Sequence, residues 1–152
     1  PMNILLTGAS RGIGAAARAS LEQAGHRVAG HSTRGGSGLI DADFARPDAP
    51  RQLWEQAIHA LGGRIDVLVN NAGIYEAISD DASDDEWHAA WARTMTVNLQ
   101  ASSDLSRLAI QHFREAGGGR IVNVASRAGY RGDSPQHWHY AASKAAMVAV
   151  TK

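Results

Sequence analysis

The chain has no cysteine among its 152 residues, which excludes disulfides, thiolate metal sites and cysteine nucleophiles. Its 15 basic and 15 acidic residues cancel, and no basic run is long enough to grip nucleic acid. No apolar stretch approaches the ~20 residues of a membrane-spanning helix, and no signal peptide precedes the first apolar run. We therefore expect a cytoplasmic globular protein that binds neither nucleic acid nor membrane.

Apolar runs and helical patterns alternate along the chain. The expected strands are 3–6, 27–31, 38–41, 65–70 and 120–125, and the expected helices are 12–24, 48–61, 84–98, 101–116 and 138–151. Such alternation is typical of a parallel, doubly wound sheet with helices on both faces, an α/β fold of three layers. The length predicts a single domain over residues 1–152.

Three glycines lie between the first strand and the first helix. Gly8, Gly12 and Gly14 belong to Thr7-Gly-Ala-Ser-Arg-Gly-Ile-Gly. A helix N-terminus behind a glycine turn presents backbone N–H groups to a phosphate, and glycine lets the backbone approach a pyrophosphate closely. The pattern predicts a dinucleotide site, with a ligand-free glycine turn as the alternative.

Two later strands end in polar residues. The run 65–70 leads into Asn70-Asn71-Ala72-Gly73, and the run 120–125 leads to Ser126. Ligands of open α/β sheets bind beyond the carboxyl ends of the strands. We expect Asn71, Gly73 and Ser126 at one crevice, although each segment alone reads as an ordinary core strand.

Tyr140 and Lys144 are spaced i, i+4 in Tyr-Ala-Ala-Ser-Lys. That spacing places both side chains on one helix face. A lysine cation nearby favours the ionised phenol and prepares it for acid–base work at neutral pH. Alone, this spacing is weak evidence for a catalytic pair, because an alanine-rich helix can contain it by chance.

Together, and in this order, these motifs resemble those of the short-chain dehydrogenase/reductase superfamily over essentially the whole chain. The resemblance implies a Rossmann-like fold and reversible hydride transfer between a nicotinamide cofactor and a carbonyl or secondary alcohol. It implies that Tyr140 is the acid/base, that Lys144 holds the nicotinamide ribose, and that Ser126 binds the substrate oxygen. Asn98 would anchor a water that relays protons, although an asparagine in helical sequence usually indicates a surface residue or a local bend.

The resemblance also implies a cofactor-binding set, with no metal ion. Its members are Gly8, Ser10, Arg11, Gly12, Ile13, Gly14, Arg34, Asp43, Phe44, Asn71, Ala72, Gly73, Tyr140 and Lys144. NAD-binding folds place an acid at the end of the second strand, but no acid occurs here before Asp41. Arg11 and Arg34 could pair with a 2′-phosphate. NADP(H) is therefore favoured, NAD(H) stays possible, and solvated arginines are the alternative.

The loop before Tyr140 contains one departure from the pattern of the superfamily. Ser126 and Tyr140 are fourteen positions apart, one more than in many relatives, which leaves Ser134 as the weaker alternative to Ser126. His137 and Trp138 precede Tyr140 without any metal-binding pattern. We interpret them as a wall of the substrate pocket, or equally as a surface loop.

Relatives in that superfamily are longer, so we expect this chain to be the N-terminal part of a longer enzyme, or an incomplete record, without the last two strands of the sheet. Strand 120–125 would then be an uncovered edge. In the superfamily, helix 101–116 and the Tyr–Lys helix commonly build a homodimer or homotetramer, although packing on the chain's own sheet also explains part of the apolar stripe. A non-catalytic NADP(H) sensor and an inert fragment remain as alternatives. The sequence does not indicate which small molecule is the substrate.

Overall fold

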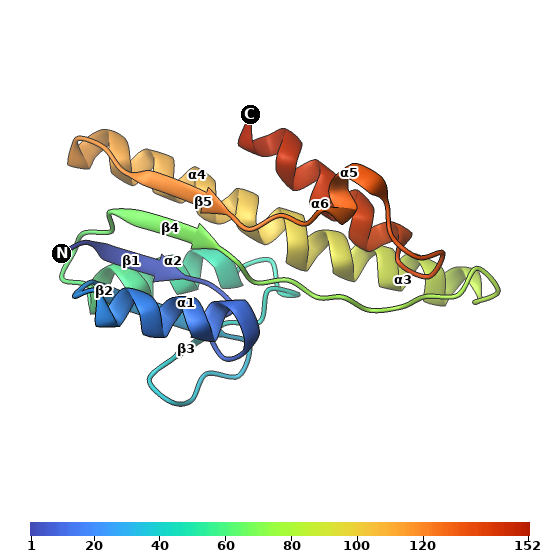
Figure 1. The fold of residues 1–152 in the computed structure, drawn as a ribbon, viewed down its shortest axis with the longest axis horizontal. Helices are drawn as coiled ribbons and strands as arrows, with labels where there is room; N and C mark the ends of the chain where they lie inside the picture. The colour runs from blue at the N-terminus through green and yellow to red at the C-terminus, as the bar shows by residue number, and fades with distance from the viewer.

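Five parallel strands lie side by side in the order β3-β2-β1-β4-β5 (Figure 1). The computed structural model describes all residues 1–152, and its strands are β1 (Asn3–Leu6), β2 (Arg27–Ser32), β3 (Ile40–Asp41), β4 (Val67–Asn70) and β5 (Arg120–Asn123). Every expected strand is present, and those expected at 38–41, 65–70 and 120–125 are shorter. The prediction of a parallel, doubly wound sheet is confirmed.

The helices connect these strands across both faces of the sheet. They are α1 (Gly12–Gln23), α2 (Ala49–Ala60), α3 (Asp84–Met95), η1 (Thr96–Gln100), α4 (Ala101–Ala116), α5 (Ala128–Arg131) and α6 (Trp138–Thr151). Helix α1 covers β1 and β2 on one face, while α2 lies behind the sheet (Figure 1). Two details differ from expectation: the helix expected at 84–98 becomes a π-helix after Met95, and the short α5 was not predicted.

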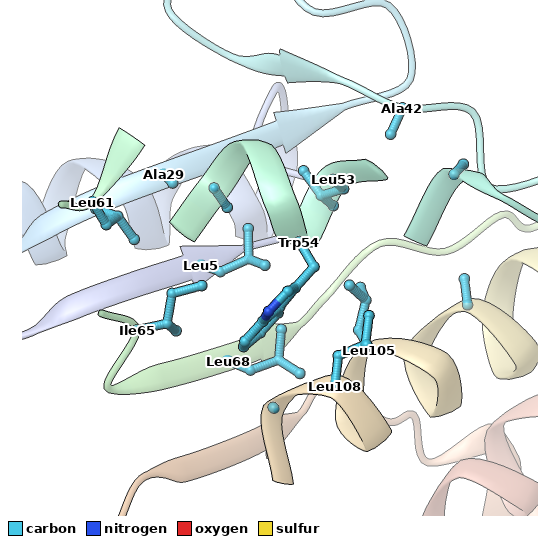
Figure 2. Close-up of a cluster of buried hydrophobic side chains, with 14 of the residues drawn as sticks. Leu5, Ala29, Ala42, Leu53, Trp54, Leu61, Ile65, Leu68, Leu105 and Leu108 are labelled. Atoms are coloured by element: carbon cyan, nitrogen blue, oxygen red, sulfur yellow. The ribbon is translucent and has the colours of Figure 1, made fainter. Parts of the chain in front are cut away.

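The main apolar core lies between the sheet, α2 and α4 (Figure 2). Leu5 and Leu68 face it from the strands, and Leu53 and Trp54 face it from α2. The apolar stripe of α4 completes it with Leu105, Leu108, Ala109 and Phe113. Burial of one leucine side chain stabilises the fold by about 1.5–3 kcal/mol. The stripe is therefore accounted for by the chain's own core, and no subunit contact is needed to explain it.

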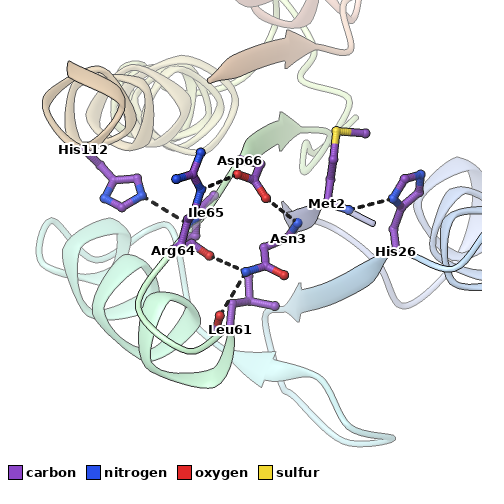
Figure 3. Close-up of polar contacts among 8 residues, drawn as sticks. All are labelled: Met2, Asn3, His26, Leu61, Arg64, Ile65, Asp66 and His112. Carbon is purple, nitrogen blue, oxygen red and sulfur yellow. Dashed lines mark hydrogen bonds and ion pairs between the residues drawn. The ribbon is translucent and has the colours of Figure 1, made fainter. Parts of the chain in front are cut away.

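At the amino ends of the strands, polar contacts join the start of β1 to the residues just before β4 (Figure 3). The Asp66 carboxylate accepts a hydrogen bond from the Asn3 backbone N–H at 2.8 Å and one from Arg64 Nε at 2.7 Å. The Asn3 side chain donates to the carbonyls of Leu61 and Arg64. These contacts set the register of the two strands and hence the level at which both deliver their carboxyl ends.

Strand β5 forms one edge of the sheet and pairs only with β4. Its composition is that of a central strand, yet Val122 is 42% exposed, as expected for an uncovered edge in this chain. None of the helices is both long and apolar enough to cross a membrane.

Candidate functional site

A cavity of about 420 Å³ opens at the carboxyl ends of β1, β2 and β4. It is lined by most of the residues that the resemblance implies for a cofactor, namely Gly8, Ser10, Arg11, Gly12, Ile13, Gly14, Asp43, Phe44, Asn71, Ala72 and Gly73. Arg34 is exposed and is absent from this lining. The structure thus brings together residues from four loops that are far apart in the sequence.

The glycine turn is fastened to the end of β4. Thr7 Oγ1 accepts hydrogen bonds from the backbone N–H groups of Asn71 at 3.0 Å and Ala72 at 2.9 Å. The Asn71 side chain in turn donates to the Gly8 carbonyl at 3.0 Å. A Cβ on Gly14 would lie 1.8 Å from the same Gly8 carbonyl oxygen, so only glycine allows α1 to start this close to β1.

The residues around this turn fit a dinucleotide. The first N–H groups of α1 have no partners within the helix, and its first turn contains no acidic residue. A helix N-terminus of this kind attracts phosphate, and Arg11 adds a guanidinium to the same lining. Phe44, also in the lining, is an aromatic side chain on which a base can pack.

A smaller cavity of about 170 Å³ adjoins the first and holds Tyr140 and Lys144. The two cavities share Ile13, Asn71, Gly73 and Ile74. Lys144 Nζ lies 5.9 Å from the centre of the Tyr140 ring and donates to the Val124 carbonyl at 3.0 Å. Burial lowers the pKa of Lys144, because its cation has been taken from water without a carboxylate beside it.

Asn98 is fully buried inside the π-helix η1. Its amide contacts Ile74 in the segment that follows β4, and it donates to Ser143 Oγ on α6 at 3.1 Å. Asn98 is therefore not a surface residue, and a π-helical turn interrupts the α-helix at this point. Such turns are frequent at functional sites.

Ser126 lies in a third cavity, of about 450 Å³, rather than in the one that holds Tyr140. Its Oγ accepts a hydrogen bond from the Ala128 N–H at 3.1 Å. Tyr75 lines both cavities, so they are neighbours. Ser134 lines the third cavity as well, and its Oγ lies 2.7 Å from His137 Nδ1.

One aromatic side chain, Tyr75, packs against Tyr140. The Tyr75 ring meets it edge-on at 4.7 Å and stacks on His137 at 3.9 Å, while the Tyr75 hydroxyl donates to Asp133. The Tyr75 ring therefore contacts both His137 and Tyr140. Trp138 is half exposed and packs edge-on against Trp87.

Sequence reasoning missed eight residues of the cavity at the glycine turn: His31, Ser32, Thr33, Ala45, Ile74, Glu76, Arg93 and Val97. His31 and Ser32 end β2 and Thr33 follows it; the carboxyl end of this strand was already expected at the crevice, so their position gave a usable signal. Glu76 and Arg93 pair at 2.6 Å across seventeen residues. No local pattern in the sequence indicates that contact.

A parallel sheet of this order with a glycine turn at its crevice defines a nucleotide-binding α/β protein of the Rossmann type. A model of the family described as short chain dehydrogenase matches residues 2–152. The chain belongs to the short-chain dehydrogenase/reductase family.

Two relatives illustrate the extent of the likeness. An uncharacterized oxidoreductase of Thermotoga maritima is 34% identical over 98% of this chain and 62% of its own length. The short-chain dehydrogenase/reductase FrzI of Cladobotryum sp is 35% identical over 97% of this chain and 61% of its own length. A solved structure of 4-hydroxyisoleucine dehydrogenase complexed with NADH superposes with a TM-score of 0.84 at 29% identity, covering 97% of this chain and 65% of that one. The chain spans about three fifths of the length of these relatives.

Proposed function

We propose that this chain carries the cofactor site and the proton-transfer residues of an NADP(H)-dependent oxidoreductase that interconverts a small-molecule carbonyl and a secondary alcohol. The observation that carries the proposal is the junction of two cavities. Gly73 and Ile74 belong both to the cavity of the glycine turn and to the cavity of Tyr140 and Lys144. A dinucleotide extended along the first cavity therefore has its far end at the phenol.

The proposed roles follow from this arrangement. The bound nicotinamide supplies the hydride donor or acceptor. The Tyr140 hydroxyl gives its proton to the carbonyl oxygen during reduction and takes it back during oxidation. The buried Lys144 cation stabilises negative charge beside the phenol and donates to the ribose hydroxyls. Ser126, in the adjoining cavity, donates to the substrate oxygen as charge develops on it.

The choice of NADP(H) is supported by Arg11 and by the lack of an acid at the end of β2. That strand ends in His31 and Ser32, and Thr33 follows them in the cavity lining. A guanidinium pairs strongly with phosphate, whereas the end of β2 contains no carboxylate that could accept a hydrogen bond from a ribose 2′-hydroxyl. Arg34 lies outside the lining, so the charge argument rests on Arg11. NAD(H) is the comparison cofactor, since the structural relative was solved with NADH.

Titration of the natural full-length protein with NADPH and NADH tests the cofactor. Arg11→Ala removes a charge-assisted contact, and we expect NADPH to bind about tenfold more weakly while NADH binding hardly changes. The matched control is Arg51→Ala on the exposed side of α2. Tighter binding of NADH, with Arg11→Ala weakening both cofactors alike, contradicts the NADP(H) proposal.

Substitution of Tyr140 separates the enzyme from a non-catalytic sensor. Tyr140→Phe removes the proton donor, and we expect kcat for carbonyl reduction to fall by about 10²-fold or more with NADPH affinity retained. Tyr130→Phe is the control, since Tyr130 is 77% exposed. A wild-type protein that binds NADPH but turns over no carbonyl or alcohol in a broad panel supports the sensor. Failure of the 152-residue chain to bind either NADPH or NADH supports an inert fragment.

We further propose that the natural protein is a homodimer or homotetramer. Ile110 of α4 and Val150 of α6 are apolar and exposed at 44% and 56%, which supports a contact with another subunit. Light scattering measures the mass, and a monomer contradicts this assembly.

A further inference from the structure

His31 occupies the end of β2 with its side chain 2% exposed. Its ring stacks on Phe44 at 4.4 Å between centroids, with 19° between the planes. The Gly8 backbone N–H donates to His31 Nδ1 at 3.1 Å, and His31 Nε2 lies 2.8 Å from the Ala42 carbonyl oxygen. One buried ring thus contacts the glycine turn, the loop after β3 and the aromatic side chain of the cavity.

These partners define the tautomer. Nδ1 accepts from an N–H group and so carries no proton, whereas a carbonyl oxygen can only accept, so Nε2 carries the proton and donates it to Ala42. The ring is neutral in this arrangement. A proton on Nδ1 would place two donors, the imidazolium N–H and the Gly8 N–H, against each other.

The carbonyl side of Gly8 also makes hydrogen bonds that hold it in place. Its carbonyl accepts from the Asn71 side chain at 3.0 Å, and the next N–H, of Ala9, donates to the His31 carbonyl at 2.7 Å. Gly8 has φ +65°, a left-handed conformation that few other residues adopt. The first bend of the turn is therefore fixed by side chains from the ends of β2 and β4, the two strands that flank β1.

From this geometry we infer that His31, as the neutral tautomer protonated on Nε2, is a positioning residue for the cofactor: it holds the glycine turn in its binding conformation and couples that turn to Phe44. The inference rests on the proposed function, because it assigns His31 to the same dinucleotide site. His31 has both ring nitrogens engaged and needs no contact with the cofactor. It acts through Gly8 and Phe44.

Burial of the His31 ring favours its neutral form. Burial lowers the pKa of His31, a shift that the Ala42 carbonyl and Asp41 only partly oppose. Strand β1 contributes no titratable side chain. The other titratable residues on the elements and loops around β2 include Arg18 and Glu22 of α1, which pair with each other, Arg27 at the start of β2, the exposed Arg51, Glu55 and His59 of α2, and the loop residues Arg11, His26, Arg34, Asp43, Arg46 and Asp48. Cofactor affinity should therefore be constant at alkaline pH and fall when acid protonates His31.

Three substitutions separate the two ring nitrogens. His31→Asn keeps an oxygen acceptor near the position of Nδ1, His31→Gln keeps a donor near the position of Nε2, and His31→Phe keeps only the stacked ring. The control is His59→Gln, the same chemical change at an exposed position. Each full-length variant is titrated with NADPH between about pH 5.5 and about pH 8.5, on both sides of the ordinary histidine value. Urea unfolding reports whether each variant is folded.

At pH 8.5, we expect His31→Phe and His31→Gln to bind NADPH about tenfold more weakly than wild type, because both lack the acceptor for the Gly8 N–H. We expect His31→Asn to restore affinity to within about threefold and to remove the acid-dependent loss. The change should raise the KM for NADPH and leave kcat unaltered. An effect on stability alone, with affinity and pH profile equal to those of His59→Gln, overturns the inference, as does equal weakening in the asparagine and phenylalanine variants. If wild type binds neither NADPH nor NADH at pH 8.5, the proposed function fails and the inference with it.

Discussion

Asn98 and Ile74 exchange two hydrogen bonds through one side-chain amide. Asn98 Oδ1 accepts from the Ile74 N–H at 2.8 Å, and Asn98 Nδ2 donates to the Ile74 carbonyl at 3.0 Å. The second amide hydrogen goes to Ser143 Oγ, which itself donates to the Tyr140 carbonyl at 2.7 Å. The side chain thus joins the segment after β4 to the helix that carries Tyr140. The proton-relay role implied for Asn98 stays a prediction.

Removal of this amide should destabilise the protein. Asn98→Ala leaves the half-buried N–H and carbonyl of Ile74 without their side-chain partner, and we expect a loss of about 1–3 kcal/mol in the free energy of unfolding. Urea denaturation of wild type and variant measures it. The control is Gln100→Ala in the same π-helix, where an exposed side chain should change stability by less than about 0.5 kcal/mol. Equal stability of the two variants contradicts the bridging role.

The contrast between Asn98 and Gly14 shows what the sequence could predict. The strand, glycine turn and helix around Gly14 are local in the sequence, and so the turn was predicted at the correct residues. The position of Asn98 depends on a π-helical turn and on partners 24 and 45 residues away. Periodicity treats a polar residue in a helix as a surface residue, because it carries no information on such distant partners.

Arg34 shows a related limit. It follows β2 by two residues, and closeness in sequence suggested closeness to the cofactor. Between β2 and β3, however, Gly35, Gly36, Ser37 and Gly38 all have positive φ, and the chain turns tightly there. The cavity is lined by Ser32 and Thr33, while Arg34 stays exposed.

Two glycines of the turn should differ in their tolerance of a methyl group. In Gly14→Ala the new Cβ would lie 1.8 Å from the Gly8 carbonyl oxygen, which is backbone and cannot give way without moving the turn. We expect NADPH binding to be lost and the melting temperature to fall. In Gly12→Ala the Cβ meets no atom within 4 Å, and only its φ of +56° costs about 1–3 kcal/mol. Thermal melts with and without NADPH distinguish the two, and equal behaviour contradicts the close approach of α1 to Gly8.

Lys144 should lower stability while serving the reaction. The one hydrogen bond of its buried cation is to the Val124 carbonyl, and burial lowers its pKa. Lys144→Met removes the cost of that charge, so we expect stability at pH 7 to be kept or raised by about 1 kcal/mol while turnover is lost. The pKa of Lys144 is lower in the folded state than in the unfolded state. Wild type therefore gains stability as the pH rises from the folded to the unfolded pKa of Lys144. The stability advantage of Lys144→Met should shrink over the same pH interval. Lys152→Met, which changes the exposed lysine at position 152, is the control. A clearly less stable Lys144→Met protein contradicts this account.

Asp66 should contribute stability that acid removes. The Arg64 guanidinium and the Asn3 N–H lower the pKa of its carboxyl group below the ordinary value of 3.8. The contribution is therefore complete above the unfolded pKa and disappears as pH falls through the folded one. Because Arg64 is 57% exposed, solvent screens the ion pair, and most of the effect comes from the hydrogen bond to Asn3. We expect Asp66→Asn to unfold about 1 kcal/mol more easily at neutral pH, with no difference from wild type once acid has protonated Asp66. Urea titrations at both pH values measure this, with the exposed Asp80→Asn as control. A difference that persists unchanged in acid shows that the carboxylate charge contributes nothing and that shape alone matters at this end of the sheet.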